Sequence, residues 1–109
     1  MKSRSGARRP IREKYEFKEW VREWAKRLNV TPAQIRVQRM RSKWASCSPG
    51  KWISFSEDLL AEEAGFQEYV IVHELLHLRI PNHGRLFKSL MSVHVPGWEK
   101  WKNRIERHL

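Results

Sequence analysis

Apolar residues recur at helical spacing near the start of the chain, from Phe17 to Leu28, with Arg, Lys and Glu between them. Residues three and four apart lie on one face of an α-helix. The pattern therefore predicts an amphipathic helix over about residues 12–29, with its apolar face against a core. Thr31 and Pro32 follow as a helix cap and a first-turn proline, which predicts a short helical piece there.

Two short segments have the pattern of strands. Residues 35–40 alternate between apolar and polar side chains, and residues 52–55 form a second apolar segment. Turn-forming residues, Ser48-Pro49-Gly50, precede the second segment. We expect the two strands to form an antiparallel pair, joined by a long connection through residues 44–47.

The second half of the chain is predicted to be helical. Residues 67–79 are apolar on nearly every side, so we expect a central helix that ends before Pro81. Helices and strands together predict an α+β fold. The other expected helices are a turn over residues 57–63 capped by Ser56, a helix over about residues 84–93, and a final helix or tail over residues 98–109 after a break at Pro96-Gly97.

Composition narrows the class of protein. The chain has 109 residues, of which 40% are hydrophobic and 31% charged, which suits one compact domain. We expect this domain over residues 11–109, after a flexible basic arm over residues 1–10. No apolar run approaches the roughly 20 residues of a membrane span, and no secretory signal is readable. Cys47 is the only cysteine, so an internal disulfide is impossible and a cytoplasmic location is expected.

Charge is the most unusual feature of the composition. Lys and Arg total 22 against 12 Asp and Glu, which gives a net charge of +10. Such a balance favours anionic partners, nucleic acid among them, although a solvated basic surface without a function would have the same composition.

The central helix contains the sequence His73-Glu74-Leu75-Leu76-His77, an HExxH motif. Residues i and i+4 lie one turn apart on the same helical face, so both imidazoles can bind one metal ion. Glu74 can then reach a metal-bound water without being a ligand itself. Without a metal, the same motif would be two core histidines bonded to carbonyls beside a Glu74 ion pair. The motif favours a zinc site with one ion per chain.

A catalytic zinc ion takes three protein ligands. His83 follows His77 by six residues, after a reversal at Pro81-Asn82 that can turn it back toward the ion. Glu99 is a competing third ligand, because many HExxH enzymes use a glutamate some twenty residues downstream. A surface glutamate near a helix start is the simpler explanation of Glu99, so we favour His83. Weaker candidates, each more simply explained as structural, are His94 for oxyanion stabilisation, Cys47 as a ligand or nucleophile, and Tyr69 and His108.

The segments WASCSPGKWISFS, YVIVHELLHLRIPNH and GRLF resemble the YgjP-like zinc metallohydrolases, and especially the short minigluzincins, over roughly residues 15–105. Ala45 stands where relatives often have glycine. The resemblance implies a zincin-like metallopeptidase domain with a short mixed or antiparallel sheet, a backing helix, the HExxH helix beneath it and C-terminal helices.

The same resemblance implies roles for individual residues. Zinc would be held by His73, His77 and His83, with Glu74 as the general base. Relatives are described as latent forms in which a C-terminal segment blocks the cleft, and residues 96–109 are the matching region here.

Three functions follow as hypotheses. The first is a zinc metalloendopeptidase that hydrolyses peptide bonds in a peptide or protein bound along an edge strand, either residues 43–46 or residues 52–55. The second is a metal-dependent nucleoside triphosphate pyrophosphatase, for which no Gly-rich phosphate loop is present. The third is a basic nucleic-acid-binding module with a structural zinc, whose cationic groups would include Arg36, Arg39 and Arg41.

Overall fold

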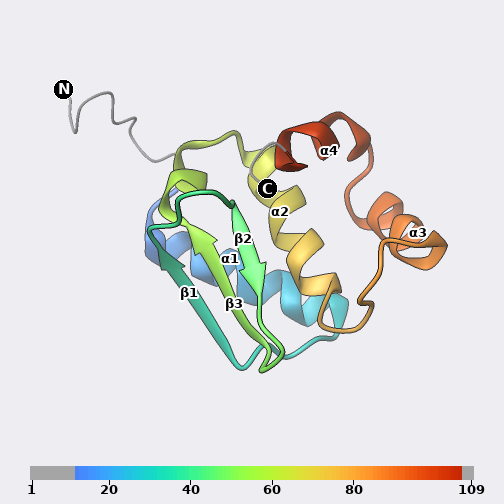
Figure 1. Cartoon of the computed structure of the whole chain (residues 1–109), viewed down its shortest axis with the longest axis horizontal. Coiled ribbons are helices and arrows are strands. Elements are labelled where there is room, and N and C mark those ends of the chain that lie inside the picture. Colours follow the sequence, from blue (N-terminus) through green and yellow to red (C-terminus); the bar gives the residue numbers. More distant parts are fainter. Residues whose placement is uncertain (1–11, 107–109) are drawn as a thin grey trace.

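The computed structural model describes residues 12–106 (Figure 1). Over these residues it contains helices and one three-stranded sheet, so the predicted α+β class is confirmed. The basic arm expected over residues 1–10, and His108, lie outside the described residues. The elements are α1 (Lys14–Leu28), β1 (Gln34–Gln38), β2 (Ala45–Cys47), β3 (Trp52–Ser56), the 3₁₀ helix η1 (Glu57–Ala61), α2 (Ala64–Leu76), α3 (Arg85–His94) and α4 (Glu99–Glu106).

The three strands form one mixed sheet in the order β1-β3-β2. β2 is antiparallel to β3, whereas β1 is parallel to β3, with Gln34 opposite Trp52 and Gln38 opposite Ser56. The predicted antiparallel pairing of residues 35–40 with residues 52–55 is therefore wrong. Residues 45–47, expected in a connection, are the hairpin partner of β3, so β1 pairs with the other edge of β3 in the parallel direction.

The connection from α1 to the sheet contains no helix. Asn29 ends α1 in the left-handed conformation, with a φ of 56°. The Ala33 N–H then donates to the carbonyl of Lys51 at 2.8 Å, which joins the chain to the sheet directly before β1. The short helical piece predicted at Thr31-Pro32 is thus wrong, because backbone pairing with the sheet overrides the local capping signal.

The core lies between one face of the sheet and the helices. Ile53 and Phe55 of β3 have no exposed surface, and the Phe55 ring meets Phe17 of α1 edge to face at a centroid distance of 5.1 Å. Helix α1 lies behind the strands in Figure 1. Helix α2 is buried on nearly every side, as its sequence predicts, and Val70, Ile71, Val72 and Leu75 have no exposed surface. In the described part of the chain, no helix has the length and apolar character needed to cross a membrane.

Gln67 joins η1 to α2. Its side chain is fully buried, and its Nε2 lies 3.0, 3.0 and 3.1 Å from the carbonyl oxygens of Leu59, Leu60 and Glu62. We expect Gln67→Leu to lower the free energy of unfolding by about 1–3 kcal/mol, because the Glu62 carbonyl would lose the amide donor and those of Leu59 and Leu60 would keep only their backbone donors. Urea denaturation measures this, with Glu68→Leu on the same helix as the control. An equal loss in the two variants would show that the Gln67 amide contributes nothing particular.

Candidate metal centre

The last turn of α2 places two histidines side by side. His73 lies within the helix and His77 is its C-cap, and both are half-buried. Their ring centroids are 4.9 Å apart, with an angle of 82° between the ring planes. This juxtaposition follows from the four-residue spacing, as the motif predicts.

His83 joins the pair from the loop that precedes α3. The Ile80 N–H donates to the Leu76 carbonyl at 2.8 Å, and the chain then turns back toward α2. The His83 ring centroid lies 5.0 Å from that of His73 and 4.7 Å from that of His77. Ring nitrogens of all three histidines lie within 4.8 Å of one another, so the structure groups the three residues that the sequence selects.

The orientation of His77 leaves a lone pair directed at the group. Its Nδ1 lies 3.3 Å from the Ile80 carbonyl oxygen, which can only accept, so Nδ1 carries the proton of the neutral ring. Burial, followed by the neighbouring His73, lowers the pKa of His77, against opposing contributions from Glu74 and the Ile80 carbonyl. A neutral imidazole with a free Nε2 is the form that binds metals.

The geometry of the nitrogens fits a zinc ion. The Nε2 atoms of His77 and His83 are 2.9 Å apart. Zinc–nitrogen bonds of about 2.0–2.1 Å in a tetrahedral site separate two ligand nitrogens by about 3.3–3.4 Å. The two nitrogens are therefore a few tenths of an ångström too close for such a site, a difference that a small rotation of the exposed His83 ring would remove. Nitrogen donors suit zinc.

Phe87 of α3 packs against the whole group. Its ring centroid lies 5.4, 5.1 and 4.8 Å from those of His73, His77 and His83, and its side chain is 4% exposed. Our sequence reasoning assigned no role to this residue. The available signal was an apolar residue four positions after His83, in the first turn of the expected helix over residues 84–93. Phe87 fixes the rings and keeps water from one side of them.

Glu74 lies beside the histidines and is 7% exposed. Its Oε2 is 3.2 Å from Nδ1 of His73. Cys47 of β2 is close enough to respond to this charge, because burial first and the Glu74 carboxylate second raise the pKa of the thiol. Cys47 is thereby kept protonated, which is unfavourable for a metal ligand or a nucleophile.

A cavity of about 910 Å³ opens over these groups. Helix α2 forms one wall, β2 with its flanking residues forms another, and α4 with the preceding Trp98 forms a third. Three lysines border it, Lys43, Lys88 and Lys102, against the single carboxylate of Glu74. The cavity is therefore cationic even before a metal ion is added.

The other candidates lie elsewhere or have structural contacts. Glu99 is exposed and borders a different hollow, beside Gly84 and Arg85. His94 meets the Trp24 ring edge to face at 5.9 Å and does not line the cavity. Tyr69 does line the cavity, where it is 3% exposed and stacks on Trp98.

The fold and this site together describe a small α+β domain with three histidines, able to hold a metal ion, at the end of a buried helix. Among solved structures, the fold is similar to the metallopeptidase zymogen abylysin of Pyrococcus abyssi, with a TM-score of 0.70 and 20% identity over 82% of this chain and 90% of that chain. It is also similar to the metallopeptidase zymogen jannalysin of Methanocaldococcus jannaschii, with a TM-score of 0.69 and 26% identity over 83% of this chain and 89% of that chain. No curated protein matches.

The sequence model of the YgjP-like metallopeptidase domain matches residues 3–108, and the chain belongs to this family. The resemblance seen in the sequence is thus confirmed, together with the fold that it implies. Membership makes the protein a hydrolase of the metallopeptidase class and implies a divalent metal ion. The three histidines are a group that could hold such an ion.

Proposed function

We propose that the chain is a zinc endopeptidase in which His73, His77 and His83 hold one zinc ion and Glu74 is the general base. Residues 11–109 would form the catalytic domain, and we place it in the cytoplasm because a lone cysteine suits a reducing compartment. The observation that carries the proposal is the convergence of three imidazoles and one buried carboxylate on the same cavity.

The residues divide the work of peptide hydrolysis. When bound, zinc would act as a Lewis acid and lower the pKa of water toward about 7. The Glu74 carboxylate accepts a proton from the attacking water and delivers it to the leaving amine. The Ile80 carbonyl holds His77 in the tautomer that binds metal, and Phe87 keeps the rings in place.

The order of the strands limits which of them can pair with a peptide substrate. β3 has a strand on each side, so residues 52–55 cannot pair with a peptide, and that alternative is wrong. Among the described strands, β2 pairs with β3 alone, and it borders the cavity, which makes it the strand for main-chain pairing with an extended peptide. The lysines around the cavity favour acidic side chains in that peptide.

We further propose that α4, within residues 96–109, maintains a latent state. The Arg104 guanidinium pairs with the carboxylates of Glu62 and Glu63 and lies 4.4 Å from the centroid of the Phe66 ring. Trp101 packs so closely that a Cβ added at Gly65 would lie 2.9 Å from its ring. These contacts hold α4 where Lys102 and Ile105 border the cavity.

Weakening these contacts should increase hydrolysis. With zinc bound, we expect Trp101→Ala combined with Arg104→Ser to cleave an unfolded protein, such as reduced and alkylated lactalbumin, at least about tenfold faster than wild type. The increase follows because a closed site that opens only fractionally reacts in proportion to that fraction. Mass spectrometry of new peptide termini measures the rate, and Asn103→Ala, exposed on the same helix, is the control.

The outcomes separate the two parts of the proposal. Equal cleavage by all three proteins would make latency wrong and leave the peptidase standing. Absence of cleavage in all three, with zinc bound and the fold intact by circular dichroism, would make the peptidase wrong. The pyrophosphatase and structural-zinc hypotheses gain no support from the family match, which is to a metallopeptidase domain.

A further inference from the structure

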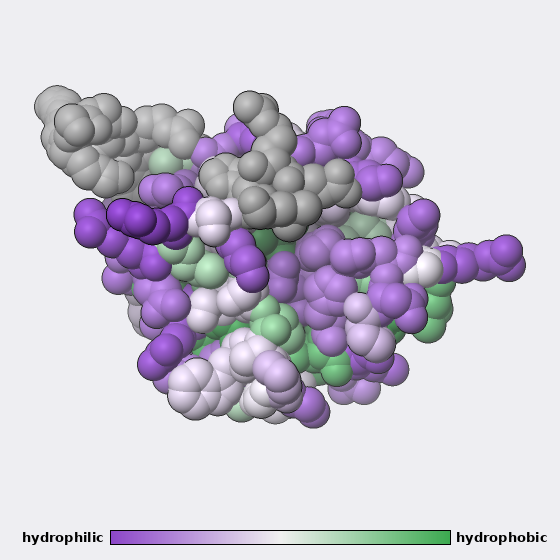
Figure 2. All heavy atoms as spheres, viewed as in Figure 1, coloured by the Kyte–Doolittle hydropathy of each residue, from purple (hydrophilic) through white to green (hydrophobic). Residues whose placement is uncertain are grey.

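The sheet has a second face that the described helices leave open. Arg36, Ser54 and Ser46 lie opposite one another across the three strands and therefore share a face. Their neighbours Val37 and Phe55 point the other way and are buried. In Figure 1 no described helix lies in front of the strands, and Figure 2 shows hydrophilic side chains along the left side of this surface.

The segment that builds this face has charge of one sign only. Residues 29–56 contain five Lys and Arg and no Asp or Glu, although the whole chain has 12 acidic residues. Helix α1 covers the opposite face of the sheet. Its solvated side mixes basic residues with Glu16, Glu19 and Glu23. The five cationic residues of the segment are Arg36, Arg39, Arg41, Lys43 and Lys51.

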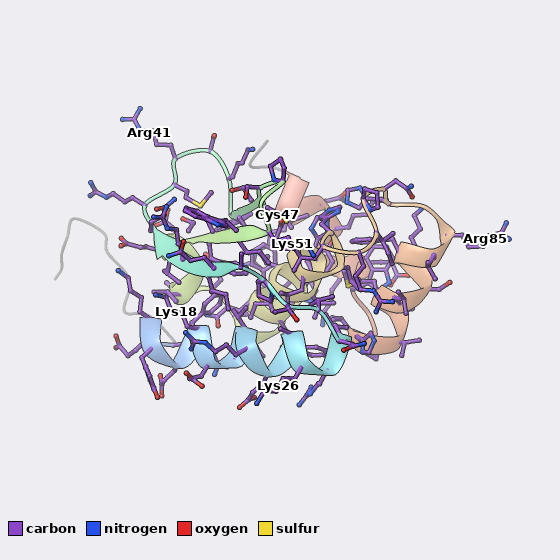
Figure 3. All side chains as sticks on the ribbon, turned by 90° about the horizontal axis from the view of Figure 1, so that it is seen from below. Lys18, Lys26, Arg41, Cys47, Lys51 and Arg85 are labelled. Atoms are coloured by element: carbon purple, nitrogen blue, oxygen red, sulfur yellow. The ribbon has the colours of Figure 1, made fainter. Side chains whose placement is uncertain are left out.

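The cationic side chains surround the open face. Arg36 lies on it, and Arg41 projects away from the body of the protein on the loop between β1 and β2, as Figure 3 shows. The same view shows Lys18 and Lys26 on α1, across the molecule from Arg41. The first acidic residues after residues 29–56 are Glu57 and Asp58, which border a hollow beside Arg41. Glu57 pairs with Lys14 at 3.4 Å.

An aromatic ring lies among these charges. Trp52 begins β3 and is 46% exposed, so part of its ring is open to solvent beside the cationic residues. The Arg36 guanidinium lies over the Trp52 ring at 5.0 Å from its centroid. An indole and a guanidinium together offer planar surfaces on which nucleic-acid bases stack.

We propose that this face, hereafter the outer sheet face, binds single-stranded nucleic acid. It consists of the residues of β1, β2 and β3 that share the side of Arg36, with Arg39, Arg41 and Lys51 at its rim. Trp52 stacks on a base, and the arginines and Lys51 contact phosphates. A single strand is favoured over a duplex because its bases are free to stack, and because the face presents no helix to enter a groove.

Fluorescence anisotropy with a labelled 20-nucleotide strand tests the proposal on the full chain. Oligo-dT, oligo-U and a duplex of mixed sequence would be compared at several KCl concentrations. We expect at least about tenfold tighter binding of a single strand than of the duplex. Affinity should fall with salt at a logarithmic slope of about −2 to −3, for three to four phosphate contacts at roughly 0.7 each.

Matched variants locate the binding. Trp52→Ala should weaken binding about 10-fold or more, with Trp52→Phe restoring most of it, since stacking survives in phenylalanine. Arg39→Glu with Arg41→Glu should weaken binding and reduce the salt slope. Lys18→Glu with Lys26→Glu makes the same change in net charge on α1 and should alter the affinity less than about threefold.

Three results would overturn the proposal: equal weakening by the two charge-reversal pairs, duplex bound as tightly as single strands, or affinity that does not depend on Trp52. Tighter binding of polyglutamate than of the oligonucleotides would show that the face instead recognises acidic protein. Thermal unfolding of each variant confirms that it is folded, and the exposure of Trp52 and of both arginines makes this outcome expected.

Discussion

Glu74→Gln should reduce the hydrolysis of an unfolded protein by a factor of about 10²–10⁴, the usual contribution of a positioned general base. Glutamine has nearly the same shape as glutamate, so it fits the nearly closed environment in which Glu74 is 7% exposed. Its amide cannot accept a proton from water near neutral pH. The change therefore removes the base and leaves the histidines in place. Glu74→Gln is best introduced into the protein that carries Trp101→Ala and Arg104→Ser, because these two changes should raise the rate of hydrolysis from which the loss is measured.

Zinc content distinguishes a general base from a metal ligand. Elemental mass spectrometry should find the same zinc per chain in Glu74→Gln as in the unsubstituted protein, because Glu74 is proposed as a base and not as a ligand. Glu68→Gln, half-buried on the same helix, is the control and should keep full activity. Undiminished hydrolysis by Glu74→Gln would make the assignment of the base wrong. Loss of zinc with activity would instead identify Glu74 as part of the metal site.

The group of histidines could be predicted because its geometry is local. His73 and His77 are brought together by the helical repeat alone. The five residues between His77 and His83 include a proline, which leaves little freedom for the position of His83. Such short-range relations are present in the sequence itself. The roles of these residues remain proposals, whereas their juxtaposition is a property of the fold.

The strand pairing could not be predicted because it depends on distant partners. Residues 45–47 form a strand too short to show an alternating pattern, and their hydrogen bonds to β3 decide the order of the sheet. Once β2 takes one edge of β3, only the other edge is open to β1. Local signals at residues 35–40 and 52–55 identify strands and contain no information about their direction.

The contacts of α4 illustrate the same limit. Arg104 and Glu62 are separated by 42 residues, and the pair exists only because α4 packs across the start of α2. A sequence shows an arginine in a basic tail and a glutamate near a helix start, both of which are usually solvated. The structure gives Glu62 a side chain that is 6% exposed and a cationic partner.

His83→Ala should remove most of the zinc from the protein. Structural zinc sites with four protein ligands bind with about 10–16 kcal/mol, so one ligand accounts for roughly 3 kcal/mol, which corresponds to an affinity lower by a factor of about 150. The Nε2 atoms of His83 and His77 are 2.9 Å apart. We therefore expect His83 to contribute as much binding free energy as any other zinc ligand. We expect near one zinc per wild-type chain after extensive dialysis and a small fraction of that in His83→Ala.

His94→Ala is the matched control for His83→Ala, because it removes a histidine that packs on Trp24 and does not line the cavity. It should retain all of the zinc, and so should Glu99→Gln, since Glu99 borders a different hollow. Full zinc in His83→Ala with loss in Glu99→Gln would require α4 to move its first residue onto the two remaining histidines. The third ligand would then come from the segment proposed to close the site, and release of α4 would remove zinc instead of exposing it.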